Sequence, residues 1–240
     1  MKPQGRHALN GLVSDHRAMH PHVLRVNSAQ RPEIWPRRLD CWLLAPIGPA
    51  VSGSRAPGGR VADQISLELA LPSLAEGCVA ITKHFGGALA EAAAVCLHEE
   101  KHQSPVTIVL NGKYPGTLLL TWPPVTDQMV RGNADPQYAT ELGAYGIAIL
   151  VVKYAGGFAV IQRSVKGTGF DYWLGAAFDA PPFQSKARLE VSGIRSGDDD
   201  TVRARVRTKE KQTKQSDDTQ LSALVVVVEF GKPRVDVAER

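Results

Sequence analysis

The sequence predicts a mixed α/β fold of the α+β type, built around a mixed central sheet. Three observations lead to this prediction. The chain has 240 residues, of which 43% are apolar, so it can bury a sizeable core. From Tyr138 onward, the hydrophobic periodicity indicates the order helix, strand, strand, strand, helix, strand. Between residues 63 and 128, one strand, one helix and two more strands are predicted, which indicates a small accessory α+β unit.

Residues 1–62 differ from the rest of the chain in composition. Segments such as PEIWPRR, APIGPA and SGSRAPGGR are rich in Pro, Gly and Arg and show no sustained period of 2 or 3.6. Such a composition does not supply an ordinary core, so this part is predicted to be a disordered or loosely attached arm.

Charge and cysteine content limit the partners and the compartment. The net charge is +4 and the sequence pI is about 9.0, a mild basic excess that permits a polyanionic partner without requiring one. Cys41, Cys78 and Cys96 form neither a CxxC pair nor an even disulfide set, which favours a reducing compartment, and we expect a cytoplasmic protein. Neither a signal-peptide pattern nor a membrane-length apolar run is present, so no membrane association is expected.

The accessory unit begins with a predicted strand over Ile65–Leu71, where apolar and polar residues alternate. Apolar side chains then recur at spacings of three and four, which predicts a helix over Leu74–Glu100. Val106–Leu110 and Leu118–Trp122 are predicted strands, with Asn111-Gly112 at the turn between them.

The end of this predicted helix contains HEEKH, from His98 to His102, which matches the HExxH pattern of zinc peptidases. That pattern requires two His ligands on one helix face, a Glu as general base and a third ligand downstream. The high charge of the motif and the helix-breaking Pro105 favour a solvated helix terminus instead. A zinc peptidase is therefore an alternative hypothesis, which predicts a third ligand near the two histidines.

The C-terminal half, residues 129–240, contains the stronger periodicities. A helix over Tyr138–Tyr154 has almost no polar face and is expected to be buried on most sides. A strand over FAVIQRSV follows, and a later helix over Asp198–Ser216 is capped by SGDDD. Leu221–Phe230 is a near-continuous β-branched run, as expected for a strand buried on both faces. The remaining residues read as a polar tail.

Two acids in apolar strands provide the main functional signal. Gly169–Leu174 contains Asp171, and Lys186–Ser192 contains Glu190. A carboxylate within a strand is costly to bury unless it is paired or binds a metal. If the two strands are neighbours, strand alternation lets both carboxylates point to the same face. Hard oxygen ligands of this kind suit Mg²⁺ or Mn²⁺, and such a site suits phosphodiester hydrolysis.

Residues 138–230 resemble the PD-(D/E)xK, or restriction-endonuclease-like, nuclease superfamily. The resemblance rests on the element order and on GFDYWLG followed by RLEVSG, which are similar to the family's metal-binding Asp strand and its (D/E)xK strand. It implies an αβββαβ core and a Mg²⁺- or Mn²⁺-dependent nuclease that hydrolyses DNA. Asp171, Glu190 and Glu141 would be the metal ligands. The resemblance also suggests a setting in bacterial defence against phage or in a mobile element.

One departure from the family pattern concerns its lysine, which would fall two residues after the Glu, where this chain has Ser192. In some families of the superfamily the following helix supplies the lysine. Lys209 lies on the same helical stripe as Val202 and Val206, so it is the predicted substitute, and Gln212 is predicted to assist it. The alternative is a solvated basic face. Beside a metal site, such a face would hold a phosphate backbone without reading sequence. Its members are Arg203, Arg205, Arg207, Lys211 and Lys214.

The rival hypothesis is a catalytically inactive nuclease-fold module that binds or scaffolds partners in a multi-protein system. It is motivated by Ser192 and by the accessory unit, which has no evident chemistry and could dock a protein partner. Glu141 also has a purely structural interpretation, since a carboxylate near a helix N-terminus is stabilised by the helix dipole. The proximity of Glu141, Asp171, Glu190 and Lys209 in space separates these hypotheses.

Overall fold

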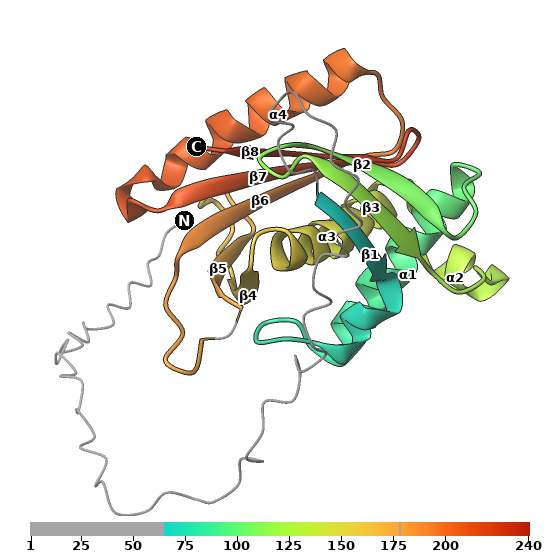
Figure 1. Cartoon of the computed structure of the whole chain (residues 1–240), viewed down its shortest axis with the longest axis horizontal. Helices are drawn as coiled ribbons and strands as arrows, with labels where there is room; N and C mark the ends of the chain where they lie inside the picture. Colours follow the sequence, from blue (N-terminus) through green and yellow to red (C-terminus); the bar gives the residue numbers. More distant parts are fainter. Residues whose placement is uncertain (1–64, 178) are drawn as a thin grey trace, which may run out of the picture. The chain divides into compact units, whose positions relative to one another are not determined.

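A computed structural model describes residues 65–177 and 179–240, so the arm predicted over residues 1–62 lies outside the described residues. The described residues confirm the mixed α/β fold class, with one eight-stranded sheet and helices on both of its faces (Figure 1). Within this part of the chain, no helix is long and apolar enough to cross a membrane.

The strands are β1 (Ile65–Ala70), β2 (Val106–Gly112), β3 (Gly116–Thr121), β4 (Phe158–Arg163), β5 (Tyr172–Ala176), β6 (Ala187–Ile194), β7 (Ser222–Glu229) and β8 (Arg234–Glu239). The α-helices are α1 (Lys83–Glu99), α2 (Asp127–Gly132), α3 (Pro136–Tyr154) and α4 (Asp199–Thr213), and the short 3₁₀ helices are η2 (Leu71–Glu76) and η3 (Lys214–Thr219).

The sheet has the order β1-β3-β2-β8-β7-β6-β5-β4. The pairs β1–β3, β2–β8 and β6–β7 are parallel, and the other neighbours are antiparallel. Strands from both predicted segments, 63–128 and 129–240, therefore belong to one sheet. The pairing of β2 with β8 joins them.

Strand β8 was not predicted, because its segment reads as a polar tail. Val235 and Val237 are buried, and they alternate with the half-buried Asp236 and Ala238. This period of two is the signature of a strand, but charged residues on the outer face conceal it in a segment of only six residues.

The helix predicted over residues 74–100 is divided in the structure. The 3₁₀ helix η2 ends at Glu76, and Gly77 then adopts a φ of 78°, a backbone conformation that favours glycine. Helix α1 begins only at Lys83, where the Thr82 hydroxyl caps it by accepting a hydrogen bond from the Phe85 amide. The apolar spacing across the break had suggested one continuous helix. The short helix α2 was also missed.

Helices α3 and α4 cover opposite faces of the sheet (Figure 1). Helix α3 lies between the sheet and α1 and is buried along almost its whole length. On the other face, α4 packs Val202 and Val206 against Val225 and Val227 of β7. Strand β7 is thus buried on both faces, as its β-branched sequence predicts.

The N-terminal part of α3 approaches β6 at Gly193. A Cβ atom at this position would lie 2.5 Å from the Thr140 carbonyl oxygen and 3.1 Å from the Ala144 side chain. Glycine therefore permits a close contact between the helix backbone and the strand, which fixes the position of α3 relative to β6.

The close contact predicts that Gly193→Ala destabilises the protein by about 2 kcal/mol, because neither backbone can move away without disturbing the core. Gly132→Ala is the control, since nothing lies within 4 Å of the Cβ it would add and alanine favours the helix α2. Urea denaturation measures both effects. Equal stability of the two variants would contradict the predicted contact.

Candidate active site

Asp171 and Glu190 lie side by side at the point where β5 begins. The register pairs Tyr172 with Leu189, so Asp171, one residue before β5, is next to Glu190 on β6. The Asp171 amide donates to the Leu189 carbonyl oxygen at 2.8 Å, and Oδ2 of Asp171 accepts from the Val191 amide at 2.8 Å. Strand β6 continues beyond its pairing with β5. The carboxylates can therefore be reached from α3 on one side and from α4 on the other.

Helix α4 brings Lys209 and Gln212 to the same carboxylate. Lys209 Nζ donates to Oε1 of Glu190 at 2.6 Å, and Gln212 Nε2 donates to the same oxygen at 3.0 Å. Lys209 Nζ also lies 3.2 Å from Gln212 Oε1. The valine stripe of α4 faces the sheet, and Lys209 continues that stripe, as the helical spacing indicates. The predicted lysine and glutamine are thus beside the predicted acids.

Ser192, two residues after Glu190 on β6, is also contacted by α4. Its hydroxyl oxygen accepts a hydrogen bond from Arg205 Nη1 at 2.8 Å. The same guanidinium lies within 3.4 Å of the Gly193 carbonyl oxygen. The assignment of Arg205 to a solvated basic face is therefore wrong, because its side chain joins α4 to β6.

Helix α3 contributes from the opposite side. The Tyr145 hydroxyl lies 2.9 Å from Oδ1 of Asp171 and 3.1 Å from Oε1 of Glu141, one helical turn earlier. Glu141 is exposed and reaches the acid pair through Tyr145. Tyr145 is not among the site residues predicted from the sequence. Its i, i+4 spacing from Glu141 was the available signal, since such residues are neighbours on a helix.

A cavity of about 380 Å³ lies beside the acid pair and is lined by residues of α3, α4, β4, β6 and the turn before β5. Glu141, Asp171, Glu190 and Gln212 line it together. The turn before β5 forms another wall and carries the exposed Lys166. The remaining lining residues are Tyr145, Arg163, Ser164, Val165, Gly167, Gly169 and Phe170.

The buried charge of the acid pair is incompletely balanced. Glu190 is 1% exposed, and among the described residues its Oε2 atom has no hydrogen-bond partner. Burial and then the negative charge of Asp171 raise the pKa of Glu190 to about 7, although Lys209 acts in the opposite direction. Burial also raises the pKa of Asp171, against the opposing effect of its hydrogen bond from the Val191 amide. A further cation in the cavity would stabilise the doubly ionised pair.

The donor set fits a magnesium ion that keeps water ligands. Mg²⁺ is usually bound by one or two carboxylates, with water and substrate phosphates completing its shell. Asp171 and the unpartnered oxygen of Glu190 meet this requirement. Within residues 65–177 and 179–240, no three His, Cys, Asp or Glu side chains are grouped to hold a metal by themselves. Glu141, the predicted third ligand, is instead hydrogen-bonded to Tyr145.

The zinc peptidase hypothesis is contradicted by the position of HEEKH. Helix α1 ends at Glu99, and Lys101 has a φ of 69°, so His98 and His102 do not share a helix face. His102 Nε2 lies 3.0 Å from the carbonyl oxygen of Phe230 and 3.1 Å from that of Gly231. This histidine therefore ties the end of α1 to the turn after β7.

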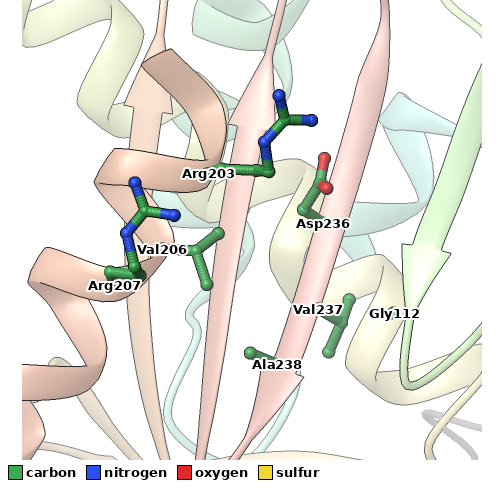
Figure 2. A pocket seen from close by; sticks show the side chains of 7 residues that line it. All are labelled: Gly112, Arg203, Val206, Arg207, Asp236, Val237 and Ala238. Atoms are coloured by element: carbon green, nitrogen blue, oxygen red, sulfur yellow. The ribbon is translucent and has the colours of Figure 1, made fainter. Parts of the chain in front are cut away.

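A second cavity, of about 240 Å³, lies between α4 and β8 (Figure 2). Arg203, Val206 and Arg207 of α4 line it together with Asp236, Val237 and Ala238 of β8. None of the predicted site residues lines this cavity. Among the basic residues of α4, Lys209 thus contacts the acid pair, whereas Arg203 and Arg207 line a separate cavity.

The chain matches no family model, no curated protein and no solved structure. The functional interpretation therefore rests on the geometry of its own residues.

The pKa of Glu190 predicts the pH dependence of stability in the presence of a chelator. A folded-state pKa of about 7, above the ordinary 4.5, contributes stability that is present at low pH and is lost as the pH rises from about 4.5 to 7. The loss is about 3 kcal/mol, at 1.36 kcal/mol per pKa unit. Chemical denaturation from pH 4.5 to 8 should show this decline, and Glu190→Gln should flatten it. Identical profiles for the two proteins would contradict the assignment.

Proposed function

We propose that this protein is a metal-dependent nuclease that hydrolyses phosphodiester bonds in DNA. The observation that supports the proposal is that Asp171, Glu190 and Gln212 line one cavity, and that Lys209 is bonded to Glu190. This arrangement combines adjacent hard oxygen ligands with a fixed positive charge, as phosphoryl chemistry requires.

In this proposal, the two carboxylates bind the metal and the lysine stabilises negative charge on the phosphate. Asp171 and Glu190 would hold Mg²⁺ or Mn²⁺, which activates water and neutralises charge on the leaving oxygen. The Val191 amide fixes the Asp171 carboxylate, and so does the Tyr145 hydroxyl. Lys209 Nζ, held beside Glu190, stabilises negative charge that develops on the attacked phosphate. Gln212 orients the lysine by accepting one of its hydrogen bonds.

DNA as the substrate is supported by a basic group at the cavity and by others elsewhere on α4. Lys166 is exposed at the cavity rim. Helix α4 carries exposed Arg203 and Arg207 at the second cavity, and exposed Lys211. Such groups bind a phosphate backbone without sequence preference, and their affinity falls steeply with salt. A cytoplasmic location and a role in bacterial defence or a mobile element belong to the same proposal.

A second candidate is a catalytically inactive binding or scaffolding module. It is favoured by the lack of a three-ligand metal group among the described residues and by the serine at position 192. This candidate predicts that the protein neither binds Mg²⁺ or Mn²⁺ nor cleaves DNA.

Cleavage of plasmid and single-stranded DNA with Mg²⁺ or Mn²⁺ tests the nuclease proposal. Asp171→Asn and Lys209→Met are each expected to lower kcat on the order of 100-fold or more, because each removes charge from the reacting phosphate or its metal. Lys211→Met is the matched control on the same helix, since Lys211 is exposed and does not line the cavity. It should change KM at most. Equal activity of wild type, Asp171→Asn and Lys209→Met would exclude the assignment.

Metal binding is tested separately from catalysis by thermal denaturation. Mg²⁺ or Mn²⁺ at 100 times its Kd should stabilise the folded wild type by about 2.7 kcal/mol, because the ion binds only the folded state. Asp171→Asn should lose this stabilisation. Arg131→Met, a charge change on the exposed end of α2, should retain it. A metal-independent melting temperature for the wild type would favour the scaffolding candidate.

A further inference from the structure

Arg163, at the end of β4, lines the cavity and is not among the site residues predicted from the sequence. Its guanidinium carbon lies 5.4 Å from the centroid of the Tyr145 ring and 5.4 Å from that of the Tyr172 ring. Across the described part of the chain, Arg163 makes no ion pair within 4 Å and no side-chain hydrogen bond. Its positive charge nevertheless acts on Asp171 and favours the ionised carboxylate.

A β-bulge places Arg163 in this position. Val160 pairs with Leu174, but one extra residue in β4 shifts the register, so that Arg163 rather than Gln162 is opposite Tyr172. Residues paired across two strands share a face of the sheet. The bulge therefore puts a guanidinium on the side of the sheet that Tyr172 and Tyr145 occupy. Bulges recur beside active sites because they redirect a side chain in this way.

The turn between β4 and β5, which lines the cavity beside Arg163, packs closely against α4. Gly169 has a φ of 81°, and a Cβ added there would lie 2.3 Å from the Gln212 carbonyl oxygen. Within the turn, Thr168 Oγ1 donates to the Val165 carbonyl oxygen at 2.9 Å. The Ser164 amide donates to the Asp171 carbonyl oxygen at 2.8 Å, which ties the residue after Arg163 to the acid pair. Arg163 thus projects from a supported strand end.

The two cations at the acid pair differ in their partners. Lys209 is bonded to Glu190, whereas the N–H groups of Arg163 have no acceptor within the described residues. An arginine held by aromatic rings keeps its planar fork of donors for a ligand, and that fork matches two phosphate oxygens. The rings reduce the freedom of the side chain without using its hydrogen bonds.

We propose that Arg163 is a substrate-binding residue that binds a phosphate of the DNA strand. The contact lies on the α3 side of the carboxylate pair, opposite Lys209. The proposal rests on the nuclease function and adds a specific contact to it. The bulge at the end of β4 is then the feature that sets this contact.

Equilibrium binding of fluorescent single-stranded and duplex oligonucleotides tests the proposal. It is measured in EDTA, where metal-dependent cleavage does not occur, and again with Ca²⁺. Arg163→Met is expected to weaken binding about tenfold, the loss of one charge-assisted contact, while still covering the tyrosine rings. It should reduce the slope of log K against log salt by about 0.9 for duplex or 0.7 for single strands, the change for one phosphate. Arg163→Lys should keep the slope and lose part of the affinity.

Arg131→Met removes the same charge from α2 and is the matched control, expected to bind like wild type. If Arg163→Met and Arg163→Lys match Arg131→Met in both Kd and salt slope, the Arg163 contact is overturned, whatever the cleavage assay shows. If wild type binds and Arg163→Met loses affinity but no protein cleaves DNA, the contact stands and the nuclease function fails. If wild type binds neither oligonucleotide, the contact is overturned. Melting temperatures of the variants confirm that they are folded.

Discussion

The ion pair between Lys209 and Glu190 is the interaction on which the C-terminal half depends. Glu190 lies on a strand covered on both faces, where an unpaired carboxylate would cost several kcal/mol. The lysine and Gln212 satisfy one of its oxygens, while the other remains without a partner among the described residues. Arg205 adds a second tie between α4 and β6 at Ser192. The helix is therefore positioned by polar contacts as well as by its valines. Stability of the fold does not explain a buried carboxylate with only one bonded oxygen. A ligand that binds the other oxygen would explain it.

The site is open because β5 begins opposite Leu189, so the rest of β6 has no strand partner on that side. Where the partner strand is missing, α3 approaches from one face with Tyr145, and α4 approaches from the other with Lys209. Each helix is held close by a glycine contact, α3 at Gly193 and the end of α4 at Gly169. The geometry of the acid pair is thus set by backbone packing on both sides. Preorganisation of this kind is what electrostatic catalysis requires, since the charged groups need not reorganise during reaction.

The acids and the lysine could be predicted because each conflicts with its local surroundings. A carboxylate within an apolar strand, and a lysine on a valine stripe, are visible in the sequence alone. Arg163 could not be predicted in this way, because its direction depends on a register shift between β4 and β5. Strand β8 was missed because charges on its outer face hide its alternation, and the start of α1 was misplaced because Gly77 interrupts a continuous apolar spacing. These features depend on pairing and backbone conformation rather than on residue type.

The packing of α1 on α3 gives the accessory segment a physical role at the site. A Cβ at Gly143 would lie 3.0 Å from the Ala93 Cα, and one at Gly146 would lie 3.1 Å from the Leu89 carbonyl oxygen, so the two helix backbones are in close contact. Helix α3 carries Glu141 and Tyr145, and α1 supports it on the side away from the sheet. Because β8 also joins β2 to the C-terminal strands, the segment is held at two places. A segment without chemistry of its own thus fixes the helix that orients Asp171.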